Sequence, residues 1–397
     1  MHVRLLASYL DKRAGSATFM RALAERLAAA GHRVSVICLG PEGVQAPAGV
    51  AHRDFAILPP VRLTAPGLWR LDHAASFAQA GRRIAALAWE PPEAVIASEH
   101  SLIRAHARLF PGVPWVYLPH AARPRVADEM APFFADPLAR AVNRRLYDRA
   151  QRFALARADA VVRFARPALD AMLAAFAGIR PERALVIPPA VALPAEWSPP
   201  RPASPVRLLH VGRLVPDKNV ALLIEMLSHV DPEKDFRLDV VGDGPERARL
   251  EGLAKAMGLE RRVTFHGAVD DVSPFHARAD LVVVPSRRES LGLVQIEALA
   301  HGRPVLAFDP AAPGVELLGG RIIDHGVTGW LARDEEDFLR ILHLLIWNPA
   351  PLRPAGRAAR RVAEERFSWP RHIARWEELL GELAREADRA RPAGLQG

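Results

Sequence analysis

The residues best suited to chemistry lie in one stretch, RRESLGLVQIEALAHGRP, at positions 287–304. It holds two glutamates, Glu289 and Glu297, on either side of a Ser-Leu-Gly-Leu run that follows a strand-like apolar segment. A helix that begins near Leu291 leaves its first backbone N–H groups without intrahelical partners, and Gly292 lets an anion approach them. Glu297 would then lie roughly two turns, or about 9 Å, into the helix. Because carboxylates accept hydrogen bonds from hydroxyls, the arrangement fits a nucleotide sugar: diphosphate at the helix start, ribose on one carboxylate and sugar on the other.

Two basic residues are placed to neutralise such a diphosphate. Arg213 and Lys218 occur in HVGRLVPDKNV, a loop predicted between a strand and a helix. A guanidinium offers a planar fork and an ammonium a mobile point charge, and both suit phosphate oxygens. Taken alone, the loop could equally be a surface salt-bridge loop. Beside the two-glutamate stretch, phosphate binding is the favoured interpretation.

A metal ion is not expected under the diphosphate. The sequence has no Asp-x-Asp at a predicted strand end, and the acidic run DEED at 334–337 is interpreted as the cap of a late helix. Positive side chains and a helix start would neutralise the diphosphate instead. We therefore predict no metal and no other cofactor, with the nucleotide sugar acting as a co-substrate.

Composition limits the other classes. The chain has 397 residues, half of them hydrophobic, which is enough for two or three domains. Cys38 is the only cysteine, so an internal disulfide is impossible and a cysteine-based metal site is not expected. The N-terminus lacks an apolar leader, and no run of 18 apolar residues occurs. These features predict a cytoplasmic protein.

Positive charge is concentrated in the first half. Residues 1–200 contain 25 Lys and Arg against 16 Asp and Glu, while the net charge of residues 201–397 is close to zero. Either an anionic partner or a solvated arginine-rich surface explains the excess. Nucleic acid is not expected, because no recognition motif accompanies the charge.

One stretch of the basic half, DPLARAVNRRLYDRAQRF at 136–153, predicts an amphipathic helix. Such a helix could lie on an anionic membrane, with the preceding PFF (132–134) inserted, or it could dock on its own domain and leave its arginines in water. The predicted apolar face consists of Val142, Leu146, Ala150 and Phe153, and the basic face of Arg140, Arg145, Arg149 and Arg152.

Two successive α/β units are predicted from the order of the apolar segments. A proline-rich stretch, 188–205, interrupts the pattern, after which strands and helices begin again. The expected fold is α/β, with two Rossmann-like doubly wound domains that face each other across a cleft. The expected divisions are 1–188 for an acceptor-binding domain, 189–205 for a linker, 206–366 for a nucleotide-sugar domain and 367–397 for one or two closing helices that cross back to the first domain.

The second half resembles the retaining glycosyltransferases of sequence family 4, which have the two-Rossmann B-type fold. The matching stretches are VGRLVPDKNV, VVGDGPERARLEGLAKAMGL, VTFHGAV, ADLVVVPSRRESLGLVQIEALAHGRPVLA and GVTGWLARDEEDF, over most of 206–340. The first half matches more loosely. Its first loop, DKRAGSA, has one glycine where the family usually has two.

The resemblance implies roles for individual residues. Arg213 and Lys218 would bind the diphosphate and stabilise the leaving nucleotide. Glu297 would hold the ribose, and Glu289 the transferred sugar. The remaining donor contacts would come from Gly15, Ser16, His266, Val269, Ser290, Leu291, Gly292 and Leu293. The stretch FHGAV at 265–269, which contains His266 and Val269, would lie by the base. On the acceptor side, His120 would lie close to the sugar, with weaker candidates at His100, Arg123 and Arg125.

The implied reaction transfers a hexose-like sugar from a UDP- or GDP-sugar to a hydroxyl of a glycan, glycolipid or small molecule, with retention. Because Glu289 is assigned to binding, a substitution on the same face of the sugar is preferred to a covalent intermediate on a carboxylate. Two alternatives stay open. One is a nucleotide-sugar 2-epimerase, and the other is a catalytically silent nucleotide-sugar-binding protein.

Overall fold

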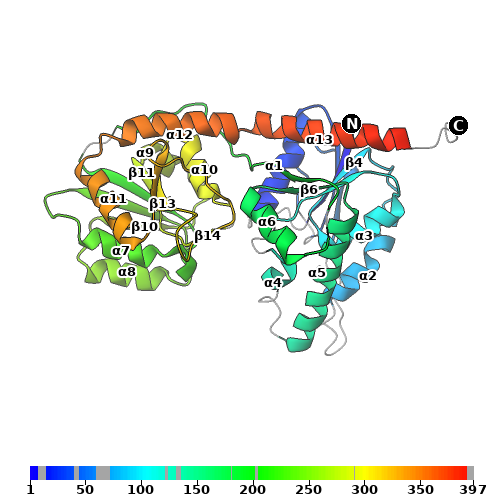
Figure 1. Cartoon of the computed structure of the whole chain (residues 1–397), viewed down its shortest axis with the longest axis horizontal. Helices are drawn as coiled ribbons and strands as arrows, with labels where there is room; N and C mark the ends of the chain where they lie inside the picture. Colours follow the sequence, from blue (N-terminus) through cyan, green and yellow to red (C-terminus); the bar gives the residue numbers. More distant parts are fainter. Residues whose placement is uncertain are drawn as a thin grey trace. The chain divides into compact units, whose positions relative to one another are not determined.

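The computed structural model describes residues 1–7, 15–39, 44–59, 72–120, 124–130, 136–179, 181–201, 204–289 and 291–390. These residues form two compact units. The first runs from Met1 to Ile187 and includes the chain from His372 onward, and the second is Pro188–Arg371. Each unit is built on its own parallel sheet with helices (Figure 1). The predicted α/β class with two Rossmann-like units is therefore confirmed.

The first unit has a seven-stranded parallel sheet in the order β3-β2-β1-β4-β5-β6-β7. Its strands are β1 (His2–Ala7), β2 (Arg33–Leu39), β3 (Phe55–Leu58), β4 (Ala94–Ala97), β5 (Trp115–Tyr117), β6 (Ala160–Arg163) and β7 (Ala184–Val186). Its helices are α1 (Gly15–Ala29), α2 (Asp72–Ala85), α3 (His100–Leu109), α4 (Val126–Met130), α5 (Pro137–Arg157) and α6 (Arg166–Ala175), with a 3₁₀ turn at His52–Asp54. The central strands are buried along their length, as expected for a parallel sheet covered on both faces.

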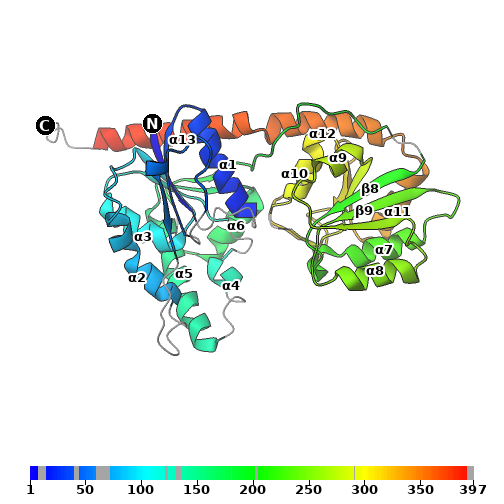
Figure 2. The same ribbon diagram turned by 180° about the vertical axis from the view of Figure 1, so that it is seen from behind.

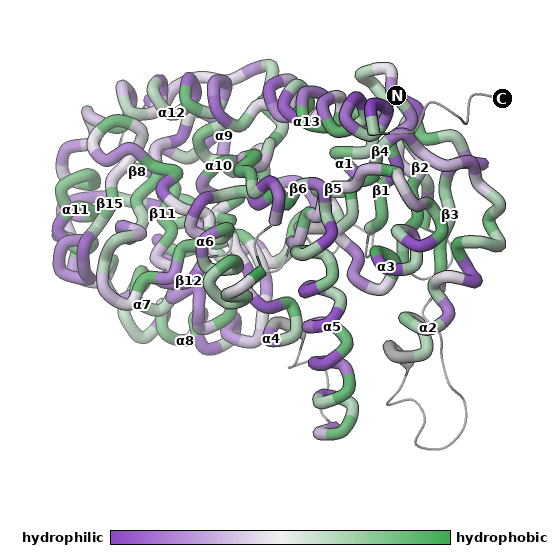
Figure 3. The backbone as a smooth tube through the Cα atoms, turned by 45° about the vertical axis from the view of Figure 1, so that its right-hand side comes forward, coloured by the Kyte–Doolittle hydropathy of each residue, from purple (hydrophilic) through white to green (hydrophobic). Residues whose placement is uncertain are grey.

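Helix α5 docks on its own unit, and its buried face differs from the predicted one. Asn143 is buried and donates to the Ala139 carbonyl at 2.7 Å, while Gln151 is buried and bonds to the backbone of Pro124 and Val126. The predicted apolar face is confirmed only at Ala150, which is buried, whereas Val142, Leu146 and Phe153 are half-buried. Gln151 can face the core because local backbone groups satisfy both ends of its amide. The Oδ1 of Asn143 is buried without a partner among the described residues. Hydrophilic and hydrophobic residues alternate along α5 (Figure 3), and its four named arginines are exposed.

The second unit has a six-stranded parallel sheet in the order β10-β9-β8-β11-β13-β15, plus a small pair, β12 and β14. Its strands are β8 (Val206–Val211), β9 (Phe236–Val241), β10 (Val263–Gly267), β11 (Leu281–Val284), β12 (Arg288–Glu289), β13 (Val305–Phe308), β14 (Glu316–Leu317) and β15 (Gly329–Ala332). Its helices are α7 (Val220–Ser228), α8 (Arg247–Ala256), α9 (Ser273–Arg278), α10 (Leu293–Ala300), α11 (Glu335–Trp347) and α12 (Leu352–Arg366), with a 3₁₀ turn, η4, at Pro216–Lys218. The segment predicted as a linker, 189–205, lies within this unit.

The C-terminal segment forms a single helix, α13 (Trp369–Ala390), rather than two. From His372 onward it belongs to the first unit, where it passes one end of α1 (Figure 2) and the His372 ring packs edge-on against Phe19 of that helix. Trp376 is fully buried, and Glu377 pairs with His32 at 3.0 Å. Further along α13, Glu382 and Glu386 both pair with Arg183. None of the described helices is long and apolar enough to cross a membrane.

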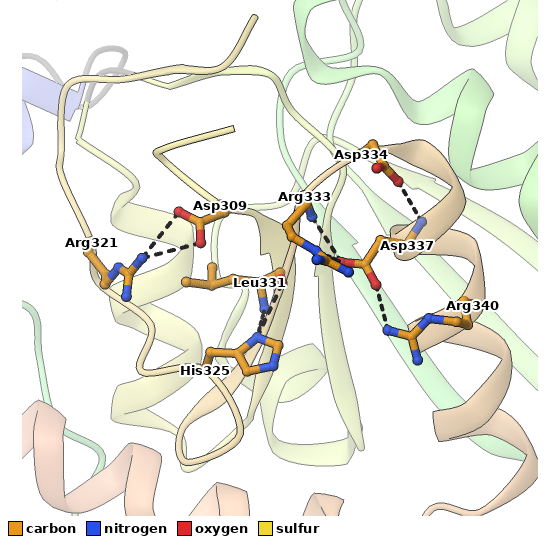
Figure 4. A network of polar contacts seen from close by, with 8 residues as sticks. All are labelled: Asp309, Arg321, His325, Leu331, Arg333, Asp334, Asp337 and Arg340. Atoms are coloured by element: carbon orange, nitrogen blue, oxygen red, sulfur yellow. Dashed lines mark hydrogen bonds and ion pairs between the residues drawn. The ribbon is translucent and has the colours of Figure 1, made fainter. Parts of the chain in front are cut away.

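The acidic run at 334–337 caps α11, as predicted. The Asp334 side chain accepts from the backbone N–H of Asp337 at 2.8 Å, while the Asp337 carboxylate accepts from Arg333 and Arg340 (Figure 4). In the same view, Arg321 pairs with Asp309 just after β13. Asp334 and Asp337 therefore stabilise the start of α11.

The cap gives a stability prediction. Replacing Asp334 with alanine leaves a helical N–H without its acceptor, which costs about 1 kcal/mol. For a unit of this size, the melting temperature should fall by roughly 2–4 °C in a thermal unfolding scan. Glu336→Ala is the matched control, because Glu336 is exposed in the same helical turn and does not cap it. Equal melting temperatures for the two variants would contradict the capping role.

Candidate active site

Two loops of the second unit leave neighbouring strands at the same edge of the sheet. Strand β8 ends at Val211, two residues before Arg213, and β11 ends at Val284, five residues before Glu289. β8 and β11 are adjacent and parallel, so both loops emerge at the carboxyl edge. Open parallel sheets bind ligands in the crevice at this edge. Arg213 is exposed and has no hydrogen-bonding or ion-pair partner for its side chain among the described residues.

The loops meet through an ion pair that the sequence did not predict. Lys218 Nζ donates to Glu289 Oε1 at 2.5 Å, and both side chains are largely buried. Lys218 ends the 3₁₀ turn, and the next residue, Asn219, adopts the left-handed conformation. Its side-chain amide donates to the Pro285 carbonyl at 3.5 Å, which joins the lysine loop to the exit of β11. Asn219 is thus a positioning residue that sequence reasoning missed.

Pairing within the unit also fixes the backbone of Glu289. It lies in β12, where Glu289 pairs with Leu317 of β14, and its carbonyl accepts from the Leu318 N–H at 3.0 Å. The backbone of Glu289 is therefore held while its carboxylate contacts Lys218. Ser290, a predicted donor contact, lies outside the described residues.

Helix α10 begins later than predicted. Gly292 is the N-cap residue with φ of 65°, and the first helical residue is Leu293 rather than Leu291. Glu297 consequently lies about one turn, or roughly 6 Å, into the helix, instead of two turns. The N–H groups of Leu293 and Val294 have no intrahelical acceptor, as at any helix start. The predicted helix start is thus present, displaced by two residues, and anion binding there stays a prediction.

Gly292 should be intolerant of a side chain. A Cβ there would lie 2.6 Å from Ile322 Cδ1, and positive φ is unfavourable for alanine. We expect Gly292→Ala to destabilise the unit by about 1–3 kcal/mol and to lower donor affinity, measured by thermal unfolding and titration. Gly252→Ala is the control, because Gly252 lies inside α8 with open space around it. If Gly292→Ala is as stable as that control, position 292 does not require a glycine.

Glu297 differs electrostatically from Glu289. Its carboxylate is half-buried, with no hydrogen-bond donor among the described residues. Burial raises the pKa of Glu297 to about 7. A carboxylate in this state gains most from a ligand that brings hydroxyl donors.

His210 is a second residue that the sequence analysis missed. It is buried at the end of β8, and its Nδ1 donates to the Val283 carbonyl at 3.0 Å. Burial lowers the pKa of His210 to about 4, so the ring is neutral near pH 7. Its buried Nε2 has no partner among the described residues and lies close to Gly212, next to Arg213. A lone histidine inside an apolar strand gave no signal of this placement.

The stretch predicted to lie by the base ends β10. His266 Nε2 hydrogen bonds with Asp239 Oδ1 at 2.6 Å, and its ring packs edge-on against Phe275. Val269 is half-buried and packs against a core cluster of the sheet. Contact of either residue with a base stays a prediction.

In the first unit, the two predicted histidines have different surroundings. His100 is buried as the first residue of α3, and its Nε2 hydrogen bonds with Tyr117 Oη at 2.7 Å, which favours a structural role. His120 follows β5 and packs between Phe19 and Phe164. Burial, reinforced by the charge of Arg163, lowers the pKa of His120 to about 3. A neutral ring at working pH suits orientation of a sugar better than proton transfer.

The other first-unit candidates are placed only in part. Arg125 donates to the Ala175 carbonyl at 2.6 Å and lies over the Phe176 ring, so it is anchored inside the unit. Gly15 and Ser16 are the first two residues of α1. Arg123 lies outside the described residues. Acceptor and donor contacts of these residues stay predictions.

The chain has two α/β units, each with its own parallel sheet, and the second carries a basic loop and a helix start at the carboxyl edge of its sheet. These are features of the B-type glycosyltransferase fold. A family model described as "Glycosyl transferases group 1" matches residues 205–348, and one described as "Glycosyl transferase 4-like domain" matches residues 14–190. Because the two models together cover most of the chain, it belongs to the glycosyltransferases that they describe.

Individual relatives share parts of the chain. It is 37% identical over 171 residues to a D-inositol 3-phosphate glycosyltransferase of Rhodococcus opacus. The aligned region covers 40% of this chain and 37% of that protein. It is 30% identical over 183 residues to the N-acetyl-alpha-D-glucosaminyl L-malate synthase of Bacillus anthracis, covering 45% and 46%. The chain spans between 21% and 48% of the length of the first curated relatives it matches.

Similarity to solved structures extends over nearly the whole chain. The structure of Anabaena Alr3699/HepE in complex with UDP superposes with a TM-score of 0.70 at 20% identity, covering 96% of this chain and all of that one. At this identity the similarity establishes the fold alone.

Proposed function

We propose that the protein transfers a hexose-like sugar from a nucleotide diphosphate sugar to an acceptor hydroxyl, with retention of anomeric configuration and without a metal. The observation that carries this proposal is the 2.5 Å contact of Lys218 with Glu289, beside a helix start capped by Gly292. An ammonium, a carboxylate and free N–H groups then lie together at the ligand-binding edge of the sheet.

Each group would meet a different part of the donor. Arg213 and Lys218 would hold the diphosphate, together with the N–H groups of Leu293 and Val294. Glu289 would accept hydrogen bonds from the transferred sugar, and Glu297 from the ribose. Lys218 contacts Glu289 in the structure, and on donor binding it would turn from the carboxylate toward phosphate.

The arrangement favours substitution on one face of the sugar. A double displacement would need a free carboxylate at the anomeric carbon, and Glu289 is already engaged by Lys218. We propose that the leaving phosphate takes the acceptor proton while Arg213 and Lys218 stabilise the developing charge. A sugar trapped covalently on Glu289 would refute this mechanism.

Donor and acceptor are proposed by class. A UDP-sugar is the first choice, because the similar Anabaena protein has been solved with UDP and with UDP-glucose, and a GDP-sugar is the second. The acceptor would be a hydroxyl of a glycan, lipid-linked sugar or small molecule bound by the first unit, with His120 close to the sugar.

The test is a donor screen. Purified protein is incubated with UDP-, GDP- and ADP-sugars, with candidate acceptors and with EDTA in half of the samples. We expect release of the nucleotide from donors of one base only, at a rate that EDTA does not change. The anomeric coupling constant of the product, measured by NMR, should show the same anomeric configuration as the donor sugar. Inversion would refute retention, and loss of turnover with EDTA would refute metal independence. A C2 epimer as product would indicate the epimerase, and binding without turnover a silent protein.

Cytoplasmic location with peripheral membrane attachment is also proposed. The support is a set of exposed arginines on α5, including Arg145 and Arg149. Sedimentation with vesicles should recover more protein on anionic than on neutral lipid, and the difference should shrink with salt. Equal recovery on both lipids would remove this part of the proposal.

A further inference from the structure

A basic pocket lies at the opposite edge of the second sheet from the candidate active site. Arg207 is the second residue of β8, Asp280 directly precedes β11, and Arg303 comes two residues before β13. These strands are adjacent and parallel, so all three residues lie at the amino edge. Strand β8 has six residues, which separates this edge from Arg213 by roughly 20 Å. The pocket is therefore distinct from the proposed donor site.

The pocket consists of two adjoining hollows of about 290 and 310 Å³. Each is close to the roughly 300 Å³ at which small-molecule sites begin. Both are lined by Ser198 and Arg303; Arg207 and Asp280 line the first, and Trp197 lines the second. One ligand could therefore reach from the arginines to the tryptophan.

Arg303 is an unusual residue at such a place. Its side chain is 3% exposed, and Nη2 donates to the Ala277 carbonyl at 2.8 Å. Its Nε is buried without an acceptor in the described part of the chain. A buried guanidinium donor left unpaired costs free energy. An anion in the pocket would supply the missing acceptor.

The charge around the first hollow is positive. Arg201 and Arg207 also line the first hollow, and within the described residues neither side chain pairs with a carboxylate. Arg278 is committed to Asp239. One oxygen of Asp280 accepts from the backbone N–H of Arg207 at 3.0 Å. Among the described residues, Asp280 is the only carboxylate that lines the first hollow, and Glu196 lines the second. The first hollow thus presents an excess of guanidinium groups, the side chains best matched to phosphate oxygens.

Trp197 forms a rigid wall of the second hollow. It is 38% exposed, and Arg360 lies over its ring at 5.4 Å. On its buried side it packs against Gly302, where φ is 66° and a Cβ would lie 2.7 Å from the indole. A held, partly exposed indole offers a flat apolar surface to a ring.

We propose that this pocket binds a small phosphorylated molecule, with its phosphate on Arg303 and Arg207 and its ring against Trp197. The inference is independent of the reaction at the other edge. It assigns the second unit two anion sites, one at each end of its strands.

The test is calorimetric titration of the full chain at constant ionic strength, with inorganic phosphate and glucose 6-phosphate as probes. Arg207→Ala should weaken both probes at least fivefold. Trp197→Ala should weaken glucose 6-phosphate at least threefold and leave phosphate unchanged. Arg237→Ala, an exposed arginine on the neighbouring strand β9, should leave both unchanged. Arg303→Met should abolish binding if it folds, and Arg207→Ala carries the test if it does not.

A donor-site variant separates the two sites. Arg213→Ala should bind both probes as the unaltered protein does. The proposal is overturned if Arg213→Ala weakens the probes and Arg207→Ala does not, since the phosphate would then occupy the donor site. It is also overturned if the unaltered protein binds neither probe at millimolar concentration. Binding of phosphate with no advantage for glucose 6-phosphate would refute the role of Trp197.

Discussion

Replacing Arg213 with alanine is expected to lower kcat by about 10²–10³-fold and to leave the melting temperature unchanged. The loss follows because Arg213 would stabilise charge that develops on the leaving nucleotide, a type of interaction whose removal typically has this size. Stability should not change, because the side chain is exposed and has no partner among the described residues. Steady-state kinetics with a saturating donor measure the effect.

The control is Arg261→Ala, which removes an exposed arginine far along the chain from the site loops. It should keep full activity. Lys218→Ala should also lower kcat, but it should reduce stability too, because it leaves Glu289 without the ammonium that now contacts it. Combining Lys218→Ala with Glu289→Ala should recover part of that stability. Full activity of Arg213→Ala or Lys218→Ala would defeat the leaving-group assignment.

The affinity for the nucleotide sugar should rise about tenfold between pH 6 and pH 8. The pKa of Glu297 is raised by burial to about 7, so at pH 6 the carboxyl group is mostly protonated, and at pH 8 it is mostly ionised. Ribose hydroxyls donate best to the ionised form, which links binding to release of a proton. Isothermal titration with an intact nucleotide sugar measures the change, because the second ionisation of a terminal phosphate, near pH 6, would confuse a titration with the free nucleotide.

Glu297→Gln should remove the pH dependence and bind the donor with lower affinity than the unaltered protein at pH 8. The same variant should melt at a higher temperature at pH 8. A carboxyl group whose pKa is raised in the folded state makes folding less favourable once the pH exceeds its unfolded value, and glutamine lacks that charge. A pH dependence that persists in Glu297→Gln would show that another group is responsible.

The positions of the strands were predictable from the sequence because buried parallel strands are continuous apolar runs. The strand before the loop of Arg213 and Lys218, β8, and the strand before the two-glutamate stretch, β11, were both identified in this way. The start of α10 was placed two residues early because Gly292 adopts positive φ as the cap. A glycine in a sequence is compatible with either position, and tight packing against Ile322 decides between them.

The candidate site was predictable in composition but not in its contacts. Lys218 and Glu289 are 71 positions apart, so no local pattern could show that one holds the other. Nor could the sequence show that His100 bonds to Tyr117 inside the fold. On α5, Asn143 and Gln151 look like surface residues, and the sequence could not show that backbone groups bond to the Nδ2 of Asn143 and to the amide of Gln151.

Helix α13 affects the order in which the two units can finish folding during synthesis. The first unit is discontinuous in sequence, since it needs Trp376 and the rest of α13 beside residues from Met1 to Ile187. A growing chain emerges N-terminus first, so the seven-stranded sheet is made early, but its unit lacks α13 until the residues beyond Arg371 have left the ribosome. The second unit, Pro188–Arg371, contains all of its own elements and can close before that happens. We therefore expect the half translated second to finish folding first.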